Sequence, residues 1–133
     1  MKRAFGSAAG FTMIEMLIVV SMITIIAGMS MAQYKHGTTL AQEAALKEDL
    51  FRMREAIDQY YADKGQYPSD ITALVSEGYL RQVPKDPFTR STDTWQTVPA
   101  EPDPSNPTAQ PGIYDVKSGS EATAQDGTKY SDW

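Results

Sequence analysis

Residues 11–32 form an almost wholly apolar run, and this run most constrains what the chain can fold into. At a rise of about 1.5 Å per helical residue, it is about long enough to cross a hydrocarbon core of roughly 30 Å. The run therefore predicts a helix that spans a membrane or packs against other apolar helices. Its one charged residue is Glu15.

Glu15 is the strongest sequence clue to function. A charge near the middle of a membrane-spanning segment costs about 2.5–3.5 kcal/mol on insertion scales, so this carboxylate is expected to have a partner. Cleavage after Gly10 would provide one, the new α-amino group of Phe11. If many copies packed their apolar helices together, the amine of a neighbouring copy would offset the cost of burying the acid. Because one axial stagger brings amine to acid, the pair would also select register.

The run GFTMIEMLIVV, residues 10–20, resembles the processing site of type IV pilins and pseudopilins. The resemblance implies that a prepilin peptidase removes a leader, residues 1–10, by cutting between Gly10 and Phe11, and N-methylates Phe11. It also implies that an assembly ATPase extracts the subunits from the inner membrane. Lys2 and Arg3 precede the run, which favours a cytoplasmic N-terminus and an exported remainder.

Two other interpretations of the N-terminal region remain open. The triplet at residues 30–32, Ser-Met-Ala, loosely fits a small-x-small cleavage site, and a conventional secretory leader would leave a soluble protein that starts at Gln33. An uncleaved membrane anchor is the second. The acid at Glu15, and only two charges before the apolar run, argue against a conventional leader.

Composition limits the remaining possibilities. A chain of 133 residues has room for one small domain. The formal net charge is −5, and loss of a leader with Lys2 and Arg3 would make it −7, which argues against nucleic acid as the main partner. The absence of Cys excludes disulfides, thiolate metal sites and Cys nucleophiles. The one histidine, His36, has no nucleophile or base patterned around it, so the sequence does not predict an enzyme.

A second helical segment is predicted between residues 40 and 61. Its apolar residues recur at alternating steps of four and three, which predicts one buried stripe. The stripe is Leu46, Leu50, Met53, Ile57 and Tyr60. Gly65 stands where a C-terminal cap is expected, and Pro68 follows as a stop. Gly28 and Gly37 are expected to loosen the helix locally.

Residues 62–90 resemble the segment after the long helix of the major pseudopilin of type II secretion systems. There a G-x-Y-P turn leads through a short helix to a P-x-D-P-[FW] turn, and residues 65–68 and 84–88 match the two turns. Ser69 is expected to cap the short helix and Gly78 to close it. Packing and turn roles, not chemistry, are expected for Tyr67, Leu74, Leu80, Pro87 and Phe88.

The last part of the chain combines strands with loops. Residues 94–98 and 113–117 are predicted to pair as antiparallel strands, separated by an irregular proline-rich segment. In the resembled pseudopilins, a final acidic loop binds calcium, so Glu121, Asp126 and Asp132 are candidate Ca²⁺ ligands. The chain departs from that loop, because Glu121 replaces a usual Asp and residues 122–124 replace part of a Gly-rich turn. The alternative is a solvated polar tail.

These observations predict an α+β, pilin-like fold: a long N-terminal helix packed on a small C-terminal antiparallel sheet with extended loops. The expected parts are a leader at 1–10, a transmembrane and polymerising half-helix at 11–32, and a periplasmic globular domain at 33–133. The expected function is a homopolymeric subunit of a type II secretion-like pseudopilus. The resemblance implies a single-pass inner-membrane protein whose partners are minor pseudopilins and an assembly platform. The alternatives are a surface type IV pilin for adhesion or motility, and a secreted soluble binding module.

Overall fold

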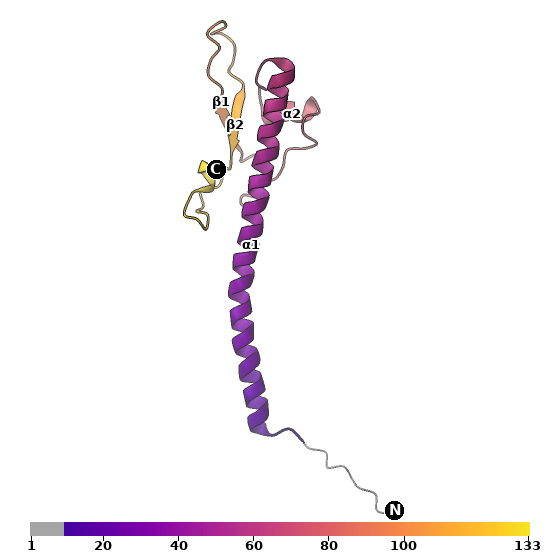
Figure 1. Ribbon diagram of the computed structural model, residues 1–133, viewed down its shortest axis with the longest axis vertical. Coiled ribbons are helices and arrows are strands. Elements are labelled where there is room, and N and C mark those ends of the chain that lie inside the picture. Colours follow the sequence, from indigo (N-terminus) through magenta and orange to yellow (C-terminus); the bar gives the residue numbers. More distant parts are fainter. Residues whose placement is uncertain (1–9) are drawn as a thin grey trace, which may run out of the picture. The chain divides into compact units, whose positions relative to one another are not determined.

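The computed structural model describes residues 10–133, so most of the predicted leader, with Lys2 and Arg3, lies outside the described residues. The elements are, in order, α1 (Met13–Lys64), α2 (Ile71–Ser76), β1 (Gln96–Pro99), β2 (Ile113–Lys117) and the 3-10 helix η1 (Tyr130–Asp132) (Figure 1). The chain divides between Thr39 and Leu40 into two compact units. This order of elements confirms the predicted α+β class with one long N-terminal helix.

In the first unit, α1 exposes large apolar side chains along its length, from Met13 to Tyr34. By length and composition, the helix is long and apolar enough to cross a membrane. α1 is continuous through Gly28 and Gly37, so neither glycine interrupts the helix, and local loosening at them stays a prediction. A single glycine costs a helix only about 1 kcal/mol relative to alanine, which the flanking residues offset.

In the second unit, the upper part of α1 carries the core. The predicted stripe is buried throughout, and Leu46, Met53 and Ile57 are fully inaccessible. Burial of one such side chain contributes about 1.5–3 kcal/mol. The stripe packs with buried residues from the rest of the unit, namely Leu74, Trp95, Ile113, Val116, Ala124 and Tyr130. The hydrophobic effect therefore holds α1 against the sheet and the C-terminal segment.

Two glycines end helices as predicted. Gly65 follows α1 with a φ of +70°, and Gly78 follows α2 with a φ of +85°, a conformation that glycine adopts at little cost. The prediction that Ser69 caps α2 is wrong. Asp70 is the N-cap, since its Oδ1 accepts a 2.7 Å hydrogen bond from the backbone N–H of Ala73.

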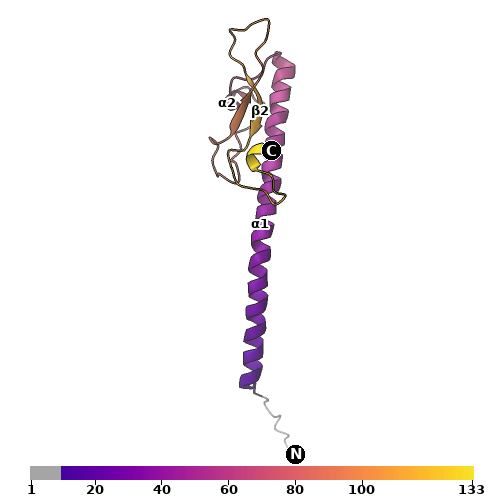
Figure 2. The ribbon, with the colours of Figure 1, turned by 90° about the vertical axis from the view of Figure 1, so that its left-hand side faces the viewer.

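Strands β1 and β2 pair antiparallel, as predicted, in a two-stranded sheet beside α1 (Figure 2). The first strand starts two residues later than expected, at Gln96. Trp95 is instead buried, and its Nε1 donates to the carbonyl of Pro84 at 2.8 Å. The proline-rich segment between the strands is irregular, and residues 101–111 are all exposed.

Candidate functional site

The N-terminal end of α1 holds the first candidate site. The backbone N–H of Glu15 donates to Thr12 Oγ1 at 3.2 Å, and the carbonyl of Thr12 accepts from Met16 N–H at 3.1 Å. Thr12 is thus the N-cap, and Thr12–Glu15 has the T-x-x-E pattern of a capping box. Since the helix begins at Met13, Glu15 lies in its first turn.

This position gives the carboxylate a favourable place within its own chain. The first N–H groups of a helix have no intrahelical partner, and the N-terminus carries a partial positive charge. The sequence alone predicts that Glu15 is a charge within an apolar run. The structure instead places it at the one end of the helix that stabilises an acid.

The predicted processing site precedes the helix. Gly10 and Phe11 are exposed, Phe11 to 79%, and both lie before the first residue of α1. An exposed, non-helical peptide bond is the kind that a peptidase can engage. Cleavage between Gly10 and Phe11 remains a prediction, and the geometry is compatible with it.

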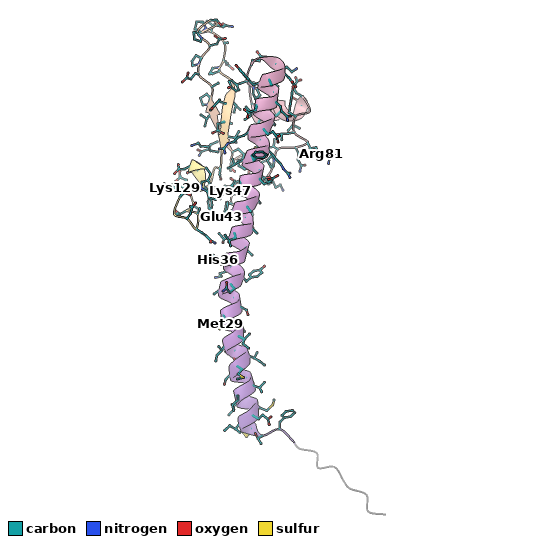
Figure 3. The ribbon with its side chains drawn as sticks, in the orientation of Figure 1. Met29, His36, Glu43, Lys47, Arg81 and Lys129 are labelled. Carbon is teal, nitrogen blue, oxygen red and sulfur yellow. The ribbon has the colours of Figure 1, made fainter. Side chains whose placement is uncertain are left out.

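A second cluster ties the C-terminal segment to α1. Glu43 is 9% exposed, and its Oε1 accepts from the Tyr130 hydroxyl at 2.8 Å and from the backbone N–H of Gln125 at 3.0 Å. Burial and the bond to Glu43 raise the pKa of Tyr130 to about 12. In Figure 3, Glu43 and Lys47 lie on α1 beside the segment that carries Lys129.

Arg54 makes a further connection between α1 and the sheet. Its guanidinium donates to Asp115 Oδ1 at 2.6 Å, to the carbonyl of Val116 at 3.1 Å and to the carbonyl of Trp133 at 2.8 Å. One side chain thus fixes β2 and the last residue relative to the helix. Together with Glu43, it determines where the C-terminal segment lies.

The three candidate calcium ligands do not form a cluster. Among residues 10–133, no group of three or more His, Cys, Asp or Glu side chains lies close enough to hold a metal ion. Asp126 Oδ1 accepts from both the N–H and the hydroxyl of Thr128, and these bonds lower the pKa of Asp126. Glu121 and Asp132 are exposed. As arranged, the three carboxylates do not fit a calcium site, and calcium binding stays a prediction.

Sequence reasoning missed Glu43 and the burial of Asp86. Asp86 is fully buried, where its Oδ1 accepts from the backbone N–H of Phe88 at 2.9 Å and its Oδ2 from the hydroxyl of Ser118. The burial of Glu43 could have been predicted, because Glu43 stands three residues before Leu46 and so continues the buried stripe. For Asp86, the only sequence indication was its place in the second predicted turn.

Comparison with known proteins places these features in a family. The type II secretion system core protein G of Pseudomonas aeruginosa is 30% identical over 96 residues, which cover 60% of this chain and 68% of that protein. This chain belongs to the type IV pilin and pseudopilin family. The competence protein ComGC of Halalkalibacterium halodurans is 28% identical over 80 residues, 60% of this chain and 78% of that protein.

A third pilin-like relative is the fimbrial protein EcpC of Eikenella corrodens, 32% identical over 79 residues. The match covers 56% of this chain and only 52% of the Eikenella protein. No protein-family model and no solved structure matches the chain. The relatives carry secretion, competence and fimbrial names and none is named as an enzyme, which agrees with the expectation of a structural pilin-like subunit.

Proposed function

We propose that this pilin-like chain is a subunit of the pseudopilus of a type II secretion-like system. It polymerises through the part of α1 that lies in the first unit. The observation that carries the proposal is the exposed apolar part of α1, residues 13–34, whose one acid, Glu15, lies in the first turn of the helix. Such a helix needs lipid or other apolar helices to cover it. Membership of the pilin and pseudopilin family supports both covers in turn. Lipid covers the helix before assembly, and the helices of other copies cover it in the filament.

The chemistry of assembly follows from the position of Glu15. Prepilin peptidase would cut between Gly10 and Phe11 and leave an α-amino group four residues before the acid. In the membrane, the N-terminus of α1 stabilises the Glu15 carboxylate within one subunit. In the filament, the amine of an adjacent subunit supplies a full opposite charge and sets the stagger between helices.

The secretion role rests on two observations. The chain shares 30% identity with core protein G of Pseudomonas aeruginosa. It also carries the P-x-D-P-F turn, whose Asp86 is buried and bonded to Ser118. In this role the subunit lies in the inner membrane with its second unit in the periplasm, and minor pseudopilins and the assembly platform are its partners.

Replacement of Glu15 tests the proposal. Glu15→Ala should leave the amount of membrane-inserted subunit unchanged and abolish most filament yield, because the amine then has no acid to meet. Glu48→Ala is the matched control, since Glu48 is an exposed acid of the second unit, paired with Arg52 on the same helix. Filament yield from Glu15→Ala equal to that of the control would overturn the assembly role of Glu15.

The N-terminus of the mature protein tests the processing step. Intact mass and N-terminal sequencing of the protein from its native membrane should give a chain that starts at N-methylated Phe11. A start at Gln33 would mean a secreted soluble protein and would remove Glu15 from the mechanism. An intact Met1 would mean a simple membrane anchor.

A surface fimbria is the second candidate, and the fimbrial protein EcpC supports it. If this chain formed a surface fimbria, shear would release its filaments from intact cells. Filaments that stay inside the outer membrane until it is opened would support the pseudopilus instead.

A further inference from the structure

The second unit carries an apolar hollow that its own core does not fill. The hollow has a volume of about 380 Å³ and lies between α1 and the C-terminal segment. Phe51 lines it and is 63% exposed, although Phe51 stands within the well-packed part of α1. Trp133 lines it from the C-terminal segment, and the charged residues of the lining are Lys47, Arg54 and Asp126.

The indole of Trp133 is held in place before any partner arrives. Its Nε1 donates to Thr128 Oγ1 at 2.7 Å, and its ring meets Tyr130 edge-on at 5.1 Å. The ammonium of Lys47 lies 4.5 Å from the ring centroid, and Arg54 binds the carbonyl of Trp133. The aromatic surface is therefore preformed, which lowers the entropic cost of binding.

The chain itself contains a segment with the chemistry that such a surface recognises. Residues 101–111 are fully exposed and contain four prolines. They also contain Glu101 and Asp103 but no Lys or Arg, so the charge of the loop is opposite in sign to the net charge of the lining, which has two cations and one acid. Prolines restrict the backbone and so lower the entropy that a loop loses on binding, and two turns, closed by Asn106 N–H to the carbonyl of Asp103 and by Ala109 N–H to that of Asn106, shape this loop further. Asp103 Oδ1 accepts from the N–H of Ser105 at 2.8 Å, which shapes the loop in advance.

The loop and the hollow lie at opposite ends of the second unit. The loop joins β1 to β2 at one end of the strands, and the C-terminal segment leaves the other end of β2 (Figures 1 and 2). One copy therefore cannot fill its own hollow. A donor at one end and an acceptor at the other make a head-to-tail contact, and head-to-tail contacts that do not close into a ring build open filaments.

We propose that the hollow between Phe51 and Trp133 receives the proline-rich loop, residues 101–111, of a second copy of this chain. The inference rests on the proposed polymerisation and names a contact between globular units that is separate from the apolar helix. Lys47 attracts the acidic part of the loop, and the two rings contact its prolines. Copies are thereby joined at the level of their second units.

A photocrosslinker in the loop tests the contact in the full-length protein. Thr108, exposed at the centre of the loop, is replaced by p-benzoylphenylalanine, and the same replacement at Gln59, exposed on α1, is the control. On irradiation of assembled protein, the probe at Thr108 should cross-link two copies, and mass spectrometry should find it on a peptide with Phe51 or Trp133. Phe51→Ala should reduce this product severalfold, whereas Phe51→Tyr should keep it, because the ring remains.

The outcomes separate the contact from the polymerisation. If filaments form and the probe at Thr108 reaches other residues, another protein or nothing, the docking inference is overturned and the filament function stands. If the unmodified chain forms no filaments in its own host, both proposals fail. A cross-link to the hollow that depends on Phe51 supports the contact.

Discussion

The hydroxyl of Tyr130 donates a 2.8 Å hydrogen bond to Glu43 Oε1, across 87 positions of sequence. Tyr130 is 2% exposed and Glu43 is 9% exposed, so the bond lies where water does not compete with it. The same oxygen accepts from Gln125 N–H. One carboxylate on α1 thus closes the C-terminal segment over the helix.

Removal of that carboxylate should destabilise the second unit. Glu43→Ala leaves a buried hydroxyl and a backbone N–H without their acceptor, and we expect the free energy of unfolding to fall by about 2–4 kcal/mol. Urea unfolding of the full chain in detergent micelles, followed by tryptophan fluorescence, measures the loss. Glu48→Ala is the control, because its exposed ion pair with Arg52 contributes at most about 1 kcal/mol. Equal losses in the two variants would show that the hydrogen bonds of Glu43 stabilise the fold no more than an exposed ion pair does.

Alkaline pH should weaken the fold through Tyr130. Its pKa is raised to about 12 in the folded chain by burial and by Glu43, whereas an unfolded tyrosine titrates near about 10. The stabilisation is complete below pH 10. Between these values the unfolded chain binds fewer protons than the folded chain, so the free energy of unfolding falls as pH rises.

Unfolding measured from pH 9 to pH 12 gives this slope. Tyr130→Phe should make the slope less steep, and Tyr114→Phe, which removes a tyrosine that is 58% exposed, is the control. An identical slope in all three proteins would contradict the assignment to Tyr130.

Asp86 should be the most sensitive residue of the second predicted turn. Asp86→Ala removes the acceptor of Phe88 N–H and of the Ser118 hydroxyl in a fully buried place, so we expect a loss of about 2–4 kcal/mol. Ser118→Ala should cost less, since it removes only one of these bonds. The control is Asp93→Ala, an exposed acid of the same loop. A loss no larger than that of Asp93→Ala would show that water replaces the Asp86 bonds.

Features that depend on neighbouring residues could be predicted from the sequence. The period of the stripe from Leu46 to Tyr60 gave the buried face of α1, because residues three and four apart share one side of a helix. Gly65 and Gly78 marked helix ends, since they adopt positive φ at low cost. The cap of α2 was misplaced by one residue, because Ser69 and Asp70 are both good caps and only the path of the chain selects Asp70.

Features that depend on contacts between residues distant in the sequence could not be predicted from it. Glu43 with Tyr130, and Asp86 with Ser118, are joined by folding across 87 and 32 positions, and no local pattern reports such partners. The same holds for the hollow beside Phe51, which Trp133 lines from the C-terminal segment. Glu15 was found by its charge, yet its place in the first turn depended on where the helix begins.

If the loop of residues 118–133 keeps its hydrogen-bonded arrangement, removal of calcium should leave the second unit as stable as before. Calcium takes six to eight oxygen ligands, usually with several carboxylates. Hydrogen bonds close the loop of residues 118–133, because Ala124 N–H donates to the carbonyl of Thr128 at 2.7 Å and Asp126 accepts twice from Thr128. Calcium would have to replace these bonds to gather Glu121, Asp126 and Asp132. The melting temperature of the full chain in detergent should therefore be the same in calcium and in a chelator.

Asp126→Asn decides between the two ways of closing the loop. If hydrogen bonds close it, the variant melts at a lower temperature than the wild type by the same amount with and without calcium, because Thr128 loses a charged acceptor. A ligand that binds only the folded state raises its melting temperature with concentration. A calcium-dependent rise in the wild type that Asp126→Asn abolishes would instead show that the loop rearranges around the ion, as the pseudopilin resemblance implies.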